Sequence, residues 1–181
     1  MKICKPYREC QQWHLTQGFK PDHLANDWGY KYGTFLVAPF NAKVLSIVGA
    51  DKIGTDTSYL RGGYGIRIQS IEDPTLSMVY WHTLPVFPIS VGDIVLIGQP
   101  ICQMGNSGFV LSAEGYVEVN IRTLPPYPGT HTHVTIGHNN SDGTYTPLDF
   151  SKLIDWSIPI KYDLLTSIMS VLNRIAYLFK K

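Results

Sequence analysis

The sequence predicts a mainly β protein built on an antiparallel sheet. Glycine (16), proline (12) and tyrosine (11) are plentiful, whereas charged residues make up only 16% of the 181 residues. This composition is typical of a turn-rich β protein and unlike that of a helical bundle or a disordered chain. Several short runs alternate between apolar and polar side chains, as in strands with one buried face. The length suits one domain that buries about 70% of its unfolded surface.

Charge and cysteine content exclude two further classes. The formal net charge is +1, from 15 basic and 14 acidic residues, which gives no sign of a nucleic-acid-binding protein. An odd number of cysteines disfavours a disulfide framework, although Cys4 and Cys10 could pair. Cys102 lies in the apolar run 98–104, and we expect it to be buried as a small hydrophobic residue.

Four alternating runs bounded by turn residues are expected to form strands, and they cover residues 34–38, 42–48, 64–69 and 78–82. Pro39-Phe40-Asn41 separates the first two runs, and Pro74 marks the turn between the last two. A hairpin at that turn would set His82 at the end of a strand. Between the two pairs of strands, residues 50–63 read as a polar loop.

Residues 91–108 carry glycines spaced for hairpins, where φ is often positive. No strand-to-helix transition follows them, so we expect scaffold strands beside the site rather than a phosphate-binding loop.

Two histidines two residues apart, His131 and His133, begin a run of β-branched residues. Side chains at i and i+2 of a strand point to the same face, so the two imidazoles are expected to project side by side. Neutral imidazole is the commonest metal ligand and a general base near neutral pH. The spacing alone does not decide which of the two would bind a metal.

A second pair, His23 and Asp27, has a spacing that would share one face of a helix. Pro21 upstream and Trp28-Gly29 downstream instead favour a loop that enters a strand. Two histidines and an aspartate supply three protein ligands and leave a fourth position for water. That arrangement is typical of a catalytic zinc site rather than a structural one.

These motifs and their order resemble the M23 (lysostaphin/LytM-like) metallopeptidases, which cut peptides in bacterial cell walls. The family pattern is H-x-x-x-D, then Y-x-H-L, then H-x-H, and the resemblance extends from about residue 17 to residue 149. Thr83 stands between His82 and the next leucine, and Thr132 stands where leucine is usual. Neither departure removes a ligand.

The resemblance implies a zinc metalloendopeptidase that hydrolyses peptide bonds in peptidoglycan. One zinc ion would be held by His23, Asp27 and His133, and would lower the pKa of its bound water to about 7. His131 would accept the proton of that water and later pass one to the leaving amine. His82 would hydrogen-bond the developing oxyanion.

The span of the resemblance, together with the helical spacing of apolar residues after it, gives the expected domain order. We expect an N-terminal extension over residues 1–16, a metallopeptidase domain with an antiparallel β-sheet groove over residues 17–158, and a C-terminal amphipathic helix over residues 159–181. Residues 109–129 are longer than the corresponding family segment. We expect them to add a strand or a hairpin lip beside the groove, where loops commonly carry specificity.

Residues 162–181 place apolar side chains at helical spacing with most polar side chains opposite. We expect this helix to serve attachment rather than chemistry. It could pack on its own domain, join copies of the chain, dock on a larger assembly or lie on a membrane surface.

A wall-cutting enzyme needs a route out of the cytoplasm. Residues 1–12 are polar and lack the apolar run of a secretory signal, and no run of 18 apolar residues exists. Bacteriophage particles or phage lysis would provide the route, and a trimmed sequence would also explain the pattern. The alternatives to a wall peptidase are a non-catalytic M23-like module for wall binding or assembly and a small-molecule amidase.

Overall fold

The computed structural model describes residues 3–7, 14–48, 62–117 and 121–160. In these residues one eight-stranded sheet dominates, with the order β1-β2-β11-β6-β5-β4-β7 and β12 paired to β11. All of its pairings are antiparallel, which confirms the predicted fold class. Its strands are β1 (Leu15–Gln17), β2 (Asn26–Trp28), β4 (Ala42–Val48), β5 (Tyr64–Ser70), β6 (Leu76–Thr83), β7 (Ile94–Val95), β11 (Thr132–Asn139) and β12 (Tyr145–Leu148).

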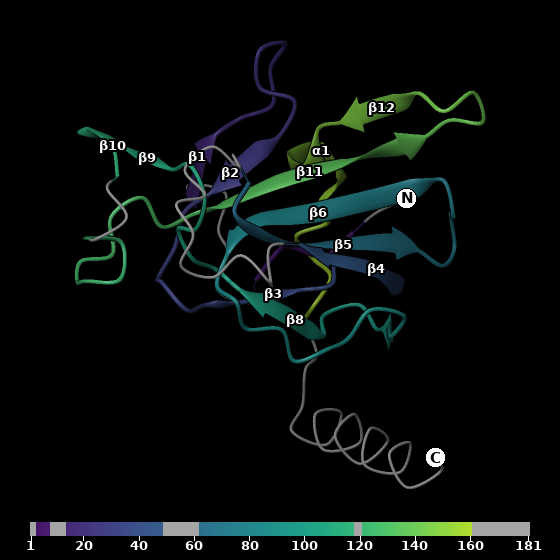
Figure 1. Cartoon of the computed structure of the whole chain (residues 1–181). Coiled ribbons are helices and arrows are strands. Elements are labelled where there is room, and N and C mark those ends of the chain that lie inside the picture. The colour runs from purple at the N-terminus through teal and green to yellow at the C-terminus, as the bar shows by residue number, and fades with distance from the viewer. Residues whose placement is uncertain (1–2, 8–13, 49–61, 118–120, 161–181) are drawn as a thin grey trace, which may run out of the picture.

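Two small sheets and a short helix complete the described fold (Figure 1). The small sheets pair β3 (Phe35–Val37) with β8 (Pro100–Gln103) and β9 (Leu111–Ser112) with β10 (Gly115–Tyr116). The helix, α1, covers Phe150–Leu153. No helix in the described part of the chain is long and apolar enough to cross a membrane.

The hydrophobic core lies between one face of the main sheet and the β3–β8 pair. Strand β6 shows the alternation that builds it: Leu76, Met78 and Tyr80 are buried in the core, while Val79 and Trp81 are less buried. The hydroxyl of Tyr80 donates to the carbonyl of Val37 at 2.9 Å, which joins β6 to β3 across the core. The opposite face of β6, which carries Val79 and Trp81, points away from the core, and its Trp81 lines the groove described below.

The four predicted strands all form, and Pro74 lies in the turn that joins β5 to β6. The scaffold interpretation of residues 91–108 is also confirmed. Gly92, Gly98 and Gly108 have φ of 92°, 83° and 75°, values at which a side chain would be strained.

Both described cysteines are buried. Cys102, as predicted, is 0% exposed, and burial raises the pKa of its thiol well above the usual range. Cys4 is 0% exposed too, and burial raises the pKa of its thiol to about 12. The pairing of Cys4 with Cys10 and the helix over residues 162–181 fall on residues outside the described ranges.

The insertion over residues 109–129 contains a hairpin lip, as predicted, formed by β9 and β10. The hairpin pairs Leu111 with Tyr116 and Ser112 with Gly115. Its two-residue turn is followed by Gly115 at a φ of 109°. The alternating run of residues 116–121 begins in this hairpin, since Tyr116 belongs to β10 and the amide of Val117 donates to the carbonyl of Val110 at 3.1 Å; residues 118–120 of the run lie outside the described ranges.

Candidate metal and catalytic site

Three of the predicted residues, His23, Asp27 and His133, meet at the end of the main sheet. Asp27 of β2 lies directly opposite His133 of β11 in the antiparallel register, so their side chains share one face. His23 precedes β2 in a turn whose backbone bonds join Lys20 and His23 in both directions, at 2.9 and 3.0 Å. The predicted loop entering a strand is therefore confirmed for this pair.

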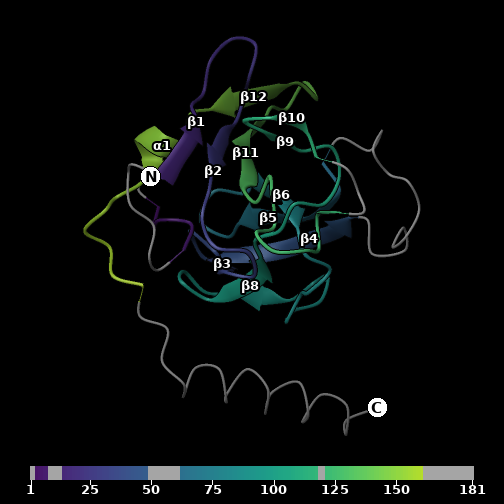
Figure 2. The same cartoon turned by 90° about the vertical axis from the view of Figure 1, so that its left-hand side faces the viewer.

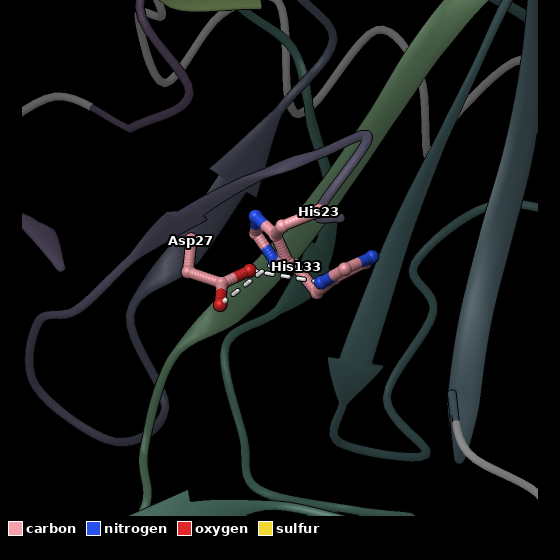
Figure 3. Close-up of side chains that lie close together, drawn as sticks. All are labelled: His23, Asp27 and His133. Carbon is pink, nitrogen blue, oxygen red and sulfur yellow. Dashed lines mark ion pairs between the residues drawn. The ribbon is translucent and has the colours of Figure 1, made fainter. Parts of the chain in front are cut away.

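The Asp27 carboxylate reaches both imidazoles (Figure 3). Its Oδ1 lies 2.8 Å from Nδ1 of His133, and its Oδ2 lies 3.3 Å from Nε2 of His23. One ligand atom from each residue lies within 4.8 Å of the others. One nitrogen from each of two imidazoles and a carboxylate oxygen at this spacing suit a divalent metal ion such as zinc.

A backbone carbonyl orients the His23 ring for that purpose. Nδ1 of His23 lies 3.1 Å from the carbonyl oxygen of Gly18. Because a carbonyl can only accept, Nδ1 carries the proton and Nε2 presents its lone pair toward Asp27. The sequence gave no indication of this acceptor, because it is a backbone group in the β1–β2 connection.

The other two predicted residues, His82 and His131, face each other beside this cluster. Their ring centroids are 4.7 Å apart, and the His82 ring is 5.9 Å from that of His133. Nδ1 of His131 donates to the carbonyl of Gly129 at 2.8 Å, and Nδ1 of His82 donates to the carbonyl of Ser107 at 2.7 Å. In both neutral rings, Nε2 is therefore an acceptor.

A β-bulge turns His82 toward the other histidines. Strict alternation along β6 would send residue 82 to the same face as Met78 and Tyr80, which lie in the core. The β5–β6 register instead pairs Trp81 with Gly65 and Thr83 with Tyr64, so His82 has no opposite partner. Its φ is 59°, which is uncommon for a non-glycine residue, and bulges of this kind redirect side chains near functional sites.

Burial keeps both of these imidazoles neutral. It is the main cause that lowers the pKa of His82 to about 3, and the neighbouring His131 lowers it further. Burial likewise lowers the pKa of His131. For Asp27, burial raises the pKa, but the hydrogen bond from His133 and the nearby histidines outweigh it and leave the pKa lowered. The ionised form of Asp27 is the protonation state that a carboxylate ligand of a metal requires.

The five residues line one open groove of about 1350 Å³. Trp81 of β6 and Leu24 also line it, together with Leu111 of β9 and Phe109, which lies just before β9. Figure 2 shows this hairpin and the β1–β2 pair on either side of β11. Trp81 lies between the core residue Tyr80 and the bulge and faces the groove, and no sequence motif marked it as a lining residue.

Comparison with known proteins supports the fold. No family model matches the chain, and no curated protein matches it. Solved structures do match, among them LytU, with 22% identity and a TM-score of 0.50 over 82% of this chain and 80% of the other. Two others are a zinc containing peptidase from Vibrio cholerae (16% identity, TM-score 0.54, 82% of this chain and 39% of the other) and a putative peptidase M23 from Pseudomonas aeruginosa (19%, 0.51, 74% and 44%). The chain spans less than half the length of the last two. It has the antiparallel β fold of the M23 peptidases.

Proposed function

We propose that this chain is a zinc metalloendopeptidase that hydrolyses peptide bonds in bacterial peptidoglycan. The observation that carries the proposal is the convergence of His23, Asp27 and His133 in one groove with two further histidines that present unprotonated Nε2 atoms. The likeness to LytU and to a zinc containing peptidase is consistent with it.

The residues present fit a zinc ion. His23 would bind through Nε2, because its Nδ1 is engaged by Gly18, and Asp27 and His133 would complete the protein ligands. When bound, zinc would supply Lewis acidity, which polarises the scissile carbonyl and lowers the pKa of water so that it becomes a nucleophile near neutral pH. The open groove leaves room for a peptide to reach this position.

His131 and His82 handle the protons. Nε2 of His131 accepts a proton from the attacking water and later delivers one to the nitrogen of the leaving amine, which completes the hydrolysis. Nε2 of His82 can donate to the oxyanion only while that ring carries a second proton, because its Nδ1 proton is committed to Ser107. The ring centroids are 4.7 Å apart and each charged ring disfavours a charge on the other, so the two histidines titrate as a coupled pair.

The test combines metal content with product analysis. Protein purified without chelators should contain one zinc ion per chain, and incubation with peptidoglycan of different cross-bridge types should release new amino groups. The absence of bound divalent metal together with no amine release would favour a non-catalytic module for wall binding or assembly. Cleavage of small amides but not of peptidoglycan would favour a small-molecule amidase.

We also propose a bacteriophage setting, in which the protein acts at the bacterial wall from a particle or after lysis. The amphipathic sequence pattern of residues 162–181 supports attachment to a larger assembly or to other copies of the chain. Mass spectrometry of purified phage particles should detect the chain if it is carried by the virion.

A further inference from the structure

A buried arginine organises the inserted segment beside the groove. Arg122 is 6% exposed, and no carboxylate among the described residues pairs with it. Its guanidinium donates to the carbonyl of Val117 from Nε at 3.0 Å and from Nη2 at 2.8 Å, and to the hydroxyl of Tyr116 at 3.0 Å. Its Nη1 donates to the carbonyl of Gly108. Burying a charge is costly unless its donors are satisfied, and here backbone carbonyls satisfy them.

These bonds close a loop. Gly108 and Val117 stand at the two ends of the segment that contains the β9–β10 hairpin, here named the lip segment (residues 108–117). One guanidinium binds the carbonyls of both ends, so Arg122 fixes the segment as a unit. Lysine lacks the forked donors that make this possible.

The inner face of the lip segment packs on the backbone that orients His131. Val110 and Val117 are 1% and 2% exposed, and a Cβ added to Gly129 would lie 3.0 Å from a methyl carbon of each. The carbonyl of Gly129 is the acceptor for Nδ1 of His131. At its other end the segment begins next to Ser107, whose carbonyl accepts from His82.

The outer face carries exposed apolar side chains into the groove. Phe109 is 43% exposed and Leu111 is 57% exposed, and both line the groove with His131 and His133. Phe109 is held in place by stacking on Tyr116, with ring centroids 5.1 Å apart. Such side chains, placed beside a reaction centre, favour an apolar partner because its burial removes hydrocarbon surface from water.

The charges that line the groove restrict the partner further. Apart from histidines, its charged lining residues among the described residues are Asp22 and Asp27, both acidic. Asp22 is paired with Lys20 at 3.3 Å, and the proposed zinc ion would offset the charge of Asp27, so the described lining leaves no cationic side chain free to pair with an acidic side chain of a substrate. An uncharged aliphatic side chain fits this wall best.

We propose that the lip segment is a specificity element, in which Phe109 and Leu111 bind an uncharged aliphatic side chain of the substrate peptide next to the scissile bond. Arg122 is the positioning residue that holds the segment against Gly129 and Ser107. This inference rests on the proposed peptidase function, because it names the substrate side chain that the same groove selects.

Binding can be tested without turnover in the full-length, zinc-loaded His131→Ala protein. Calorimetry would compare capped Ala-Ala-X-Ala-Ala peptides with X as Gly, Leu or Glu. We expect the Leu peptide to bind at least about tenfold more tightly than the Gly peptide, as hydrophobic pockets discriminate added methylenes, and the Glu peptide to bind most weakly. Adding Phe109→Ala or Leu111→Ser should remove the preference for Leu over Gly.

Matched controls exist outside the groove. Phe35 is 46% exposed and Leu96 is 52% exposed, close to the values for Phe109 and Leu111, and neither lines the groove. Phe35→Ala and Leu96→Ser should leave the preference intact. The proposal is overturned if the double variant Phe109→Ala/Leu111→Ser still prefers the Leu peptide over the Gly peptide. It is also overturned if the Glu peptide binds as tightly as the Leu peptide.

Arg122→Lys tests the positioning role. In the otherwise unaltered enzyme it should lower kcat and raise KM for peptidoglycan, because it loosens both the lip segment and the carbonyls behind the histidines. Leu111→Ser should raise KM alone. A folded Arg122→Lys protein with unchanged kcat and an unchanged preference would overturn the role of Arg122. If that protein does not fold, the exposed Leu111 still decides the specificity proposal.

The binding and turnover results separate the two proposals. Amine release from peptidoglycan together with a peptide preference that survives Phe109→Ala and Leu111→Ser would refute the specificity element and leave the peptidase function. A preference that these variants abolish, without any hydrolysis by the unaltered protein, would refute the peptidase and leave the lip segment as a peptide-binding element.

Discussion

Replacing Gly108 with alanine should damage both stability and activity. Gly108 has a φ of 75°, and a Cβ there would lie 2.7 Å from Cα of Gly63 and 2.8 Å from the carbonyl carbon of Gly62, with the amide nitrogen of Gly63 closer still. These neighbours are backbone atoms, which cannot move aside as the end of a flexible side chain can. This close backbone contact joins the start of the lip segment to the two residues that precede β5.

The cost has two parts. A side chain in the left-handed region costs about 1–2 kcal/mol, and forcing packed backbone apart adds about 1–3 kcal/mol. Together they predict a loss of about 2–5 kcal/mol, or about 4–20 °C in Tm for a chain of this size. Gly143→Ala is the matched control, because its φ is 84° but nothing lies within 4 Å of the added Cβ.

Activity distinguishes local damage from general destabilisation. Gly108 follows Ser107, whose carbonyl fixes Nδ1 of His82, so Gly108→Ala should reduce kcat even at temperatures where the protein is folded. Thermal unfolding followed by circular dichroism and amine release from peptidoglycan measure the two effects. If Gly108→Ala melts no lower than Gly143→Ala and retains full kcat, the reasoning about this contact is refuted.

Three further predictions concern the site and the C-terminal residues. Asp27→Ala should lose both bound zinc, measured by elemental analysis, and amine release, because Asp27 contacts both ligand histidines; zinc retained at one ion per chain would contradict this. The acidic limb of the pH–rate profile should lie below pH 6.5, since burial lowers the pKa of His131 and only the neutral ring is a base; a limb at or above 6.5 would count against His131. Deleting residues 163–181 should leave a folded, active protein whose oligomeric state, measured as its mass in solution, is lower than that of the full chain. A lowered Tm would instead mean that this segment packs on its own domain.

The sequence predicted the strands better than it predicted the site's surroundings. Alternation located β4 over residues 42–48, as observed, because one face of that strand packs in the core. The order of the motifs identified five polar residues that the structure brings into one groove. Those signals reside in side chains, which is why a single sequence reveals them.

What the sequence did not reveal depends on backbone and tertiary context. The carbonyls of Gly18, Ser107 and Gly129 that orient the imidazoles are present in every residue type, so no pattern marks them. The bulge at His82 follows from how β5 pairs with β6, which alternation along β6 alone contradicts. Arg122 was overlooked because a charged residue in an insertion ordinarily lies at the surface, whereas here carbonyls of its own segment bind it.

The central claim of the proposed mechanism is that His133 binds the metal whereas His131 transfers protons. His133 lies 2.8 Å from Asp27 in the ligand cluster, whereas His131 donates to Gly129 and faces His82. The most direct test measures zinc content and amine release in His131→Ala and His133→Ala side by side. We predict that His131→Ala keeps one zinc ion per chain and loses about 10²–10⁴-fold in hydrolysis, while His133→Ala loses the metal as well. Loss of zinc from His131→Ala with zinc retained in His133→Ala would contradict the account and reverse the two roles.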